Sequence, residues 1–522
     1  MTVILFYQAY IGGAVGAQVL ADYRLSFLPY AVIGAATSAC GAIAALVGGF
    51  ADKVGRANLV VYGLIACSLV TAFWIPRTHS ITGLAIAQGI AAATEGIVLV
   101  ATPALVRDFS PQVGRAQAMG FWTMGPVLGS LLVSGVSSRT LDHLPNWRDQ
   151  YVIAGFAGLA VSVVALIGLR ELNAVQRNRI VGAIEADTEA MLAARGLGKH
   201  EATRQPFRQM LKPDILASSF AISVFLLFYY TAVSFLPIFF QTVEGFTPSQ
   251  SNSLLNWLWA TTAASMVCFG VLSDKLRVRK PFMLVGSVMT VVVDIAFIAK
   301  VDDGRPSYAS IALLLALSGL WAGAVYVPWM ASFTETIERR NPALTATGLA
   351  VWGWVLRLIV ATAFFVLPQV VSSVTPLVND APAVQARANQ MAKDFPQLYV
   401  EAQAHPEIFR TLASYPDPAK IPSKVLDHAI RTVGAEALTQ LQNPRAQADL
   451  KYLSSPKSVA VQTALAESGK QWKQWLWACT AGVIIFIPLI FVLAGAWRPR
   501  RSHDDEHAIT ATNILEPAQV LK

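Results

Sequence analysis

The stretches GGFADKVGRAN, residues 48–58, and GVLSDKLRVRK, residues 270–280, decide how this sequence is interpreted. Each follows a long apolar run, and the two align at one constant offset. The aligned pairs are Gly48 with Gly270, Asp52 with Asp274, and Lys53 with Lys275. Charges that end an apolar run are commonly interfacial anchors and nothing more. Their recurrence at equivalent places predicts a chain built from two duplicated halves.

The composition around these loops indicates a membrane protein. Of the 522 residues, 54% are hydrophobic and 14% are charged, which leaves too little polar surface for a soluble globule of this length. The composition therefore argues against a secreted or cytosolic enzyme. Apolar runs of about 20 residues, enough for one helix to cross the hydrocarbon core, recur along the chain. A β-barrel is excluded because no segment alternates between apolar and polar residues.

The sequence therefore predicts an all-α membrane protein with twelve transmembrane helices in two pseudo-symmetric six-helix halves. The predicted helices of the first half cover residues 3–20, 27–51, 59–76, 81–106, 118–137 and 151–169. Those of the second half cover residues 215–241, 254–272, 281–299, 309–332, 344–370 and 475–497.

The distribution of Lys and Arg predicts the orientation. Basic residues concentrate in the even-numbered loops, in the segment between the halves and in the C-terminal tail, and such residues mark the cytoplasmic side. We expect a multi-pass protein of the cell (inner) membrane with both termini in the cytoplasm. The expected parts are an N-terminal half (1–170), a cytoplasmic linker (171–213), helices seven to eleven (214–370), an extracytoplasmic insertion (371–473), helix twelve (474–497) and a cytoplasmic tail (498–522).

Other classes of site receive little support from the sequence. The formal net charge of +8 does not indicate nucleic acid binding, because the basic residues lie in short loops and not along one stripe. The four cysteines lie inside apolar runs at scattered spacing, which predicts neither a zinc site nor disulfides. The tail segment HDDEH, residues 503–507, is read as a solvated tail. We expect no metal, no cofactor other than a proton gradient, and a monomer in the lipid bilayer.

The first loop resembles the signature of the major facilitator superfamily, Gly-x-x-x-Asp-Arg/Lys-x-Gly-Arg. The matching residues are Gly48, Asp52, Lys53, Gly55 and Arg56. The resemblance implies the major facilitator fold and a gating role for this loop, which would lock the cytoplasmic side without touching substrate. It extends that role to Asp274 and Lys275, although the second loop has Arg277 where the signature has its glycine.

The fifth predicted helix carries Gly125, Pro126 and Gly129, similar to a motif that favours antiporters in this superfamily. Small residues permit close helix approach and proline interrupts the hydrogen-bond ladder, so these residues are candidates for helix bending. The match is incomplete, because Phe121 and Ser130 stand where the motif has glycines. A role in packing alone stays open.

Two charges at membrane depth are the main candidates for function. Glu95 lies near the middle of the fourth predicted helix and Arg357 near the middle of the eleventh, where an unpaired charge is costly. Glu95 is the candidate for carrying a proton, since no histidine lies within a span, and Arg357 is the candidate for binding an anion. A structural ion pair between them is the alternative. Asp294, nearer the end of the ninth helix, is read as structural.

The resemblance places helices one, seven and ten around a central cavity, which makes their aromatic residues candidates for substrate binding. The candidates on these helices are Tyr7, Tyr229, Tyr230, Tyr326 and Trp329, and Trp352 on the eleventh helix is a further candidate. We therefore expect proton-coupled secondary transport of a small organic anion, which could be aromatic, by alternating access. Two alternatives stay open: a proton-driven antiporter for drugs or amphipathic compounds, and a membrane-embedded receptor or enzyme that uses the outer segment.

Overall fold

The computed structural model describes residues 1–47, 55–109, 121–169, 182, 205–301, 307–341, 344–413, 422–493 and 495–498. Within these ranges the regular structure is helical, with no strand. The predicted gating residues Gly48, Asp52 and Lys53 lie outside the described residues, as do most of the linker and nearly all of the tail.

Every predicted span coincides with a helix or with a broken helix. The first half contains α1 (Thr2–Ala14), α2 (Gly16–Tyr23), α3 (Phe27–Val47), α5 (Arg56–Leu69), η2 (Val70–Trp74), η3 (Ile75–Arg77), α6 (Ile81–Phe109), α8 (Gly125–Thr140) and α9 (Trp147–Gly168). The segment between the halves contains α12 (Pro206–Met210). The second half contains α13 (Pro213–Phe225), α14 (Leu227–Ser234), α15 (Leu236–Thr242), α16 (Pro248–Leu276), α17 (Lys280–Lys300), α18 (Tyr308–Arg340), α19 (Thr345–Val370) and α26 (Pro456–Leu489). The all-α membrane fold predicted from the apolar runs is confirmed.

Length and hydropathy support the membrane assignment. Among the described residues, eight helices are long and apolar enough to cross a bilayer, and two bent pairs bring this number up to ten. One pair is α1 with α2, which meet at 55°, and the other is α13 with α14, which meet at 41°. Broken helices are tolerated at membrane depth where neighbouring helices satisfy the freed backbone groups.

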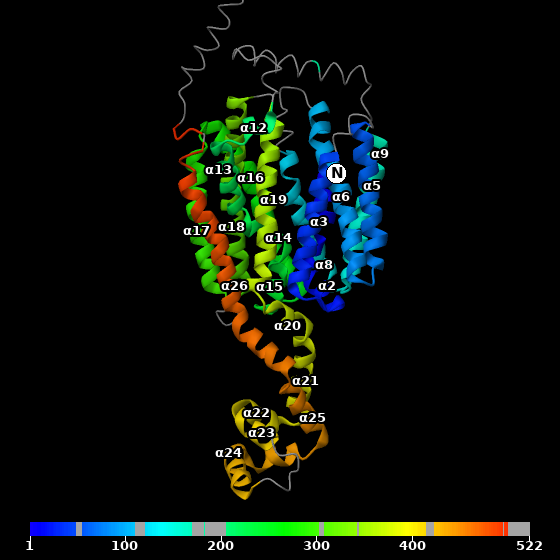
Figure 1. The fold of residues 1–522 in the computed structure, drawn as a ribbon, viewed down its shortest axis with the longest axis vertical. Coiled ribbons are helices and arrows are strands. Elements are labelled where there is room, and N and C mark those ends of the chain that lie inside the picture. The colour runs from blue at the N-terminus through cyan, green and yellow to red at the C-terminus, as the bar shows by residue number, and fades with distance from the viewer. Residues whose placement is uncertain are drawn as a thin grey trace, which may run out of the picture. The chain divides into compact units, whose positions relative to one another are not determined.

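A larger compact unit comprises Met1–Gln18, Ala31–Leu367 and Lys473–Lys522. Its helices run side by side in Figure 1, with α5 and α9 at one side and α17 and α18 at the other. The two halves approach closely where α1 crosses α14. A Cβ atom added to Gly13 would stand 1.9 Å from the carbonyl oxygen of Val233, so this crossing requires glycine.

A second compact unit comprises Val19–Tyr30 and Pro368–Trp472. It contains α20 (Val374–Asn379), α21 (Ala381–Asp394), α22 (Pro396–Ala404), α23 (Pro406–Ala413), α24 (Ser423–Leu441) and α25 (Pro444–Leu453). These helices enclose a hydrophobic core of their own, formed by Met391, Phe395, Leu398, Ile408, Phe409, Leu412, Ala429, Val433 and Ala446. The chain near residue 25 belongs to this unit: Thr375 Oγ1 accepts from the Phe27 amide at 3.0 Å, and Asn379 donates to the Leu25 carbonyl at 3.1 Å.

We expect Arg387→Ala to destabilise this second unit by about 1–3 kcal/mol, because the buried Asp449 would lose its cation. The Asp449 carboxylate is 2% exposed and forms an ion pair with Arg387, whose guanidinium also lies 5.8 Å from the centre of the Tyr452 ring. Hydrogen exchange of peptides from α21 and α25 in the full chain measures the effect. Arg445→Ala is the matched control, since Arg445 is 65% exposed and lies 3.7 Å from Asp394. Equal exchange in both variants would contradict the prediction.

Candidate functional site

Four tyrosines from both halves form a cluster within the larger unit. They are Tyr10 on α1, Tyr229 and Tyr230 on α14, and Tyr326 on α18, and each side chain is partly buried. The rings of Tyr229 and Tyr230 meet edge to face with centroids 5.2 Å apart, and Tyr229 meets Trp259 in the same way at 5.3 Å. Edge-to-face contacts fix the orientation of the rings. The cluster therefore presents a rigid aromatic surface with several hydroxyl groups.

Within this cluster, the Tyr229 hydroxyl is the polar group that lacks a hydrogen-bond partner of normal geometry. It is buried, and no hydrogen bond of normal geometry reaches it among the described residues, although the hydroxyls of Tyr10 and Ser130 lie beside it. A buried hydroxyl without a hydrogen bond costs free energy. Such a group is therefore suited to accept or donate a hydrogen bond when a ligand arrives.

Glu95 and Arg357 lie at two different edges of the tyrosine cluster. The Glu95 carboxylate, on α6, is close enough to Tyr10 for their charges to interact, and the Arg357 guanidinium, on α19, is close enough to Tyr230. Arg357 is exposed and Glu95 is partly exposed. Within the described part of the chain no ion pair or hydrogen bond joins Glu95 to Arg357. The tyrosines thus stand between two unpaired, oppositely charged groups.

The other predicted aromatic residues occupy packing positions in this conformation. Trp329 is fully buried, stacks on Phe333 with centroids 5.0 Å apart and donates its indole N–H to Ser218 at 3.1 Å. Trp352 packs against Trp329 at 5.2 Å. On α1 it is Tyr10 that interacts with Tyr229 and Tyr230, whereas the buried Tyr7 has no described interaction with the cluster.

A polar seam joins the two halves between α8 and α16. Ser134 donates to Asn256 Oδ1 at 2.7 Å, and Asn256 donates in turn to the Ser138 hydroxyl at 3.2 Å. Ser249 donates to the Ser138 carbonyl at 2.5 Å. Since these residues lie near the C-terminus of α8 and the N-terminus of α16, the seam closes that end of the interface between the halves.

The seam continues to α1 and borders a small cavity. Asn252, which is fully buried, donates to the Ala14 carbonyl at 3.1 Å. The cavity next to it is lined by Tyr10, Ser130, Ser134 and Trp259 among others, and its volume is about 10 Å³. This space is close to the minimum for one water molecule. The cavity connects the seam with the edge of the tyrosine cluster, because Tyr10 and Trp259 line it together with Ser134 and Asn252.

The small residues of the fifth predicted helix pack α8 against α1. A Cβ atom on Gly129 would stand 2.5 Å from Cβ of Phe6, and one on Gly125 would stand 2.6 Å from Cγ2 of Thr2. Pro126 lies in the first turn of α8, directly after a break in the helix at Met124. The glycines thus allow close packing of α8 against α1, and the helix is interrupted beside the proline.

The aligned positions Gly55 and Arg277 of the two repeated loops both have a positive φ angle. Gly55 has φ +98°, and Arg277, its equivalent at the offset that aligns the loops, has φ +52°. Positive φ is strained for a residue other than glycine. The two residues differ in ψ, which is +129° for Gly55 and +32° for Arg277. Arg277 adopts the left-handed helical conformation as the C-cap of α16, whereas Gly55 is the N-cap of α5. Arg56 begins α5 directly after Gly55.

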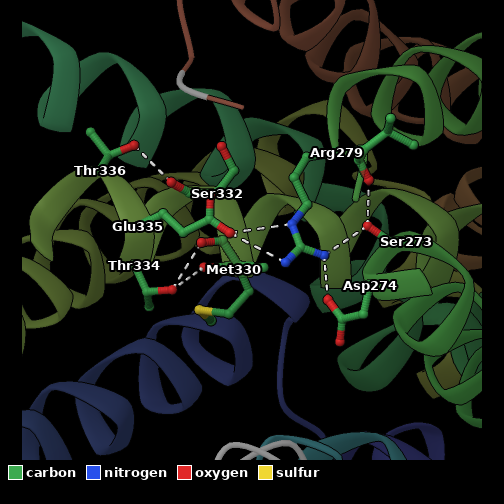
Figure 2. Close-up of polar contacts among 10 residues, drawn as sticks. Ser273, Asp274, Arg279, Met330, Ser332, Thr334, Glu335 and Thr336 are labelled. Atoms are coloured by element: carbon green, nitrogen blue, oxygen red, sulfur yellow. Dashed lines mark hydrogen bonds and ion pairs between the residues drawn. The ribbon is translucent and has the colours of Figure 1, made fainter. Parts of the chain in front are cut away.

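Asp274 is part of an ion-pair network at the other end of α16. Figure 2 shows the Arg279 guanidinium between Asp274 and Glu335, at 2.5 Å and 3.2 Å, with the Ser273 hydroxyl at 2.9 Å. Glu335 belongs to α18, so Arg279 links the ends of three helices of the second half. Lys275 lies in the last turn of α16. Sequence reasoning missed Arg279, because the signature places its arginine at the position of Val278.

We expect Arg279→Ala to lower the thermal stability of the protein more than Asp274→Asn does. The Arg279 side chain is 17% exposed and holds two carboxylates, whereas Asp274 is 69% exposed, and exposed ion pairs contribute little. Melting temperatures of the purified variants measure the difference. Arg339→Ala, a change at the end of α18, serves as the control for loss of a basic residue. A larger effect of Asp274→Asn would contradict this account.

Comparisons with known proteins agree with this architecture. The family model of the Major Facilitator Superfamily matches residues 1–376. Two curated relatives are similar to part of the chain: the MFS transporter fsa7 of Fusarium sp. (strain FN080326), 27% identical over 188 residues, and the MFS-type transporter MFS19 of Alternaria alternata, 29% identical over 189 residues. Each match covers 34% of this chain, and 36% and 38% of the relatives respectively. The chain thus spans little more than a third of the curated relatives it matches.

Solved structures resemble the chain in fold. The bacterial homologue of the human lysosomal transporter Spinster, in an inward-facing and unoccupied conformation, is 16% identical with a TM-score of 0.60, and the similarity covers 94% of this chain and 95% of that one. The xylose transporter XylE from E. coli, in a partially occluded inward-open conformation, is 14% identical with a TM-score of 0.53, covering 70% and 89%.

Proposed function

Because the chain belongs to the Major Facilitator Superfamily, we propose that it is a secondary transporter that moves a small organic anion together with a proton by alternating access. It is a multi-pass membrane protein whose two halves meet at a cluster of tyrosines. The observation that carries the proposal is the pair of unpaired charges, Glu95 and Arg357, at different edges of that cluster. The receptor and enzyme alternatives find no support in these relatives.

Arg357 supplies the anion site. Its guanidinium is exposed next to Tyr230 and has no carboxylate partner among the described residues. A guanidinium presents a fork of N–H donors that matches a carboxylate in two places at once. The tyrosine rings beside it add an apolar surface and hydroxyl groups. Together these groups suit an organic acid with an aromatic or other planar apolar part.

Glu95 supplies the proton site. Its carboxylate has neither a cation nor a hydrogen-bond donor beside it in the described part of the chain. An intramembrane carboxylate in this situation is stabilised by taking up a proton. An anion that engages Arg357 brings negative charge toward the same cluster, which favours protonation of Glu95 further. Binding of the anion and of the proton would thus assist one another.

A thermal-shift screen of the purified protein tests the anion site. Planar organic acids are compared with their methyl esters, which keep the shape and lose the charge. The proposal expects stabilisation by some of the acids and by none of the matching esters, because a ligand stabilises the state that binds it. Stabilisation by esters and acids alike would contradict a site built around Arg357.

A proton-driven antiporter for amphipathic cations is the second candidate. The observation that favours it is an unpaired carboxylate close to aromatic rings, because ring faces attract cations and Glu95 could hold either a cation or a proton. In the same screen this candidate expects stabilisation by amphipathic amines and none by acids.

We further propose that the membrane is the cell (inner) membrane, that both termini face the cytoplasm and that the seam end of the halves faces outward. The support is the bias of Lys and Arg toward one set of loops. The test is labelling by an impermeant thiol reagent in intact cells that carry a cysteine-free variant. Cysteine at the exposed Ser454 should react, and cysteine at the exposed Arg208, between the halves, should react only after lysis. The reverse pattern would contradict the orientation.

A further inference from the structure

Asp294 on α17 is a buried carboxyl group that the central site does not use. Its side chain is 4% exposed, and its Oδ2 atom is buried without a hydrogen-bond partner. The described residues form no ion pair with it. A carboxylate in such surroundings is disfavoured relative to the neutral acid, because burial removes water without supplying a counter-charge.

The two polar side chains that interact with Asp294 in the described part of the chain, Thr480 and Cys479, lie on α26 and carry no positive charge. Thr480, on α26, has its hydroxyl within reach of the carboxyl group, and that hydroxyl donates its hydrogen to the Leu476 carbonyl at 3.0 Å. A hydroxyl has one hydrogen to donate, so toward Asp294 it can act as an acceptor. A protonated carboxyl group can donate a hydrogen bond to such an acceptor, whereas a carboxylate cannot. The titratable group on α26 whose charge interacts with Asp294 is the Cys479 thiol.

A chain of polar contacts connects this region to the tyrosine cluster. Cys479 lies 3.7 Å from the hydroxyl of Thr231, which also accepts a hydrogen bond from the indole N–H of Trp475 at 3.1 Å. Thr231 directly follows Tyr229 and Tyr230 on α14. This short helix is separated from α13 by a 41° bend at Leu226 and ends at Ser234, with Phe235 as its C-cap. A shift of α14 would therefore change the tyrosine cluster and the surroundings of Asp294 together.

We propose that Asp294 is a second proton-binding site, located in the second half between α17 and α26 and coupled to the central site through α14. Asp294 binds its proton in the conformation described here. It releases the proton when α14 moves and water reaches the carboxyl group. The role of Asp294 in the transport cycle rests on the proposed function. Whether Asp294 carries a proton can be measured without transport.

The first test is chemical modification of the purified protein by dicyclohexylcarbodiimide, followed by mass spectrometry. The protonated carboxyl group transfers its proton to a carbodiimide nitrogen while the carboxylate oxygen bonds to the central carbon. The resulting O-acylisourea rearranges to a stable N-acylurea, with no group lost and nothing oxidised. We expect an adduct on the peptide that contains Asp294, and less adduct as the pH is raised. The same yield at every pH would overturn the proton assignment.

The second test is transport by Asp294→Asn, which keeps the shape of the protonated acid and cannot release a proton. Using a mixture of planar organic acids as the probe, we expect loss of accumulation driven by a pH gradient and retained exchange across the membrane. Asp294→Glu should recover part of the accumulation. Asp214→Asn, a change in a surface ion pair with Arg340, is the matched control and should behave as the unmodified protein does.

The outcomes separate this inference from the proposed function. Accumulation by Asp294→Asn equal to that of the unmodified protein would overturn a role for Asp294 in the cycle. If the unmodified protein itself does not respond to a pH gradient, the proposed function fails. A pH-dependent adduct on Asp294 would then still establish the buried proton site.

Discussion

Replacing Arg357 by alanine is expected to weaken the binding of an organic anion by about tenfold to a hundredfold, since a charge-assisted hydrogen bond contributes about 1.5–3 kcal/mol. The guanidinium is exposed beside Tyr230 and is not engaged by a carboxylate among the described residues, so the change removes a ligand contact without leaving a buried charge behind. Isothermal titration of the purified variant with an acid found in the thermal-shift screen measures the loss.

Two companion variants make this result interpretable. Arg357→Lys keeps the positive charge but not the fork of N–H donors, and should bind with intermediate affinity. Arg340→Ala removes an arginine from a surface ion pair with Asp214 and should bind as the unmodified protein does. Unchanged anion affinity in a folded Arg357→Ala protein would contradict the anion site and move the interpretation toward the cation antiporter.

The second large effect is expected for Glu95→Gln, which should lose accumulation driven by a pH gradient while keeping exchange of substrate across the membrane. Glutamine keeps the size and polarity of the protonated glutamic acid but cannot exchange a proton. The variant would therefore behave like a carrier that is always protonated. Such a carrier changes between the states that face the two sides of the membrane only when substrate is bound. Exchange of labelled for unlabelled substrate in proteoliposomes, compared with net uptake, separates the two activities.

The matched control for this change is Glu467→Gln, on an exposed position of α26, which should alter neither activity. Loss of exchange together with net uptake would indicate that Glu95 contributes to substrate binding or to folding. Retention of both activities would exclude Glu95 as the proton site.

The fold could be predicted from the sequence because a bilayer imposes a simple rule. Apolar runs long enough to cross the membrane must form helices, and every predicted span coincides with a helix in the structure. The boundaries were less predictable. α26 begins at Pro456, well before the predicted start at residue 475, because its first turns carry polar residues such as Lys470 that hydropathy does not assign to a span.

The candidate site could be predicted in part. Glu95 and Arg357 were identifiable because charges are costly at membrane depth, and Tyr229, Tyr230 and Tyr326 do lie in the tyrosine cluster. Tyr7 and Tyr10 are three residues apart on one helix, so spacing alone could not decide which of them reaches the cluster. That choice depends on the rotation of α1 against α14, which tertiary packing sets.

The contacts that join helices could not be derived from one sequence. Asn252 and Asn256 are polar residues inside an apolar span, and this was a usable signal, since polar residues commonly link helices at membrane depth. Their partners on α8 and α1, however, come from the other half of the chain. Arg279 was missed for a different reason: the signature has its arginine at the position of Val278, and Arg279 is the next residue.

Net uptake of an identified organic acid into proteoliposomes, driven either by a pH gradient or by a membrane potential, tests the central claim most directly. With Glu95 as the one proton carrier, a monoanion that moves with one proton carries no net charge, so a potential should drive no accumulation although it is worth about 2.3 kcal/mol per charge per 100 mV. A second proton delivered by Asp294 would add one positive charge per cycle, and accumulation would then respond to the potential as well as to the pH gradient. We expect accumulation when a pH gradient alone is imposed. Accumulation driven by the potential alone, with no response to the pH gradient, would contradict coupled movement of the anion and a proton.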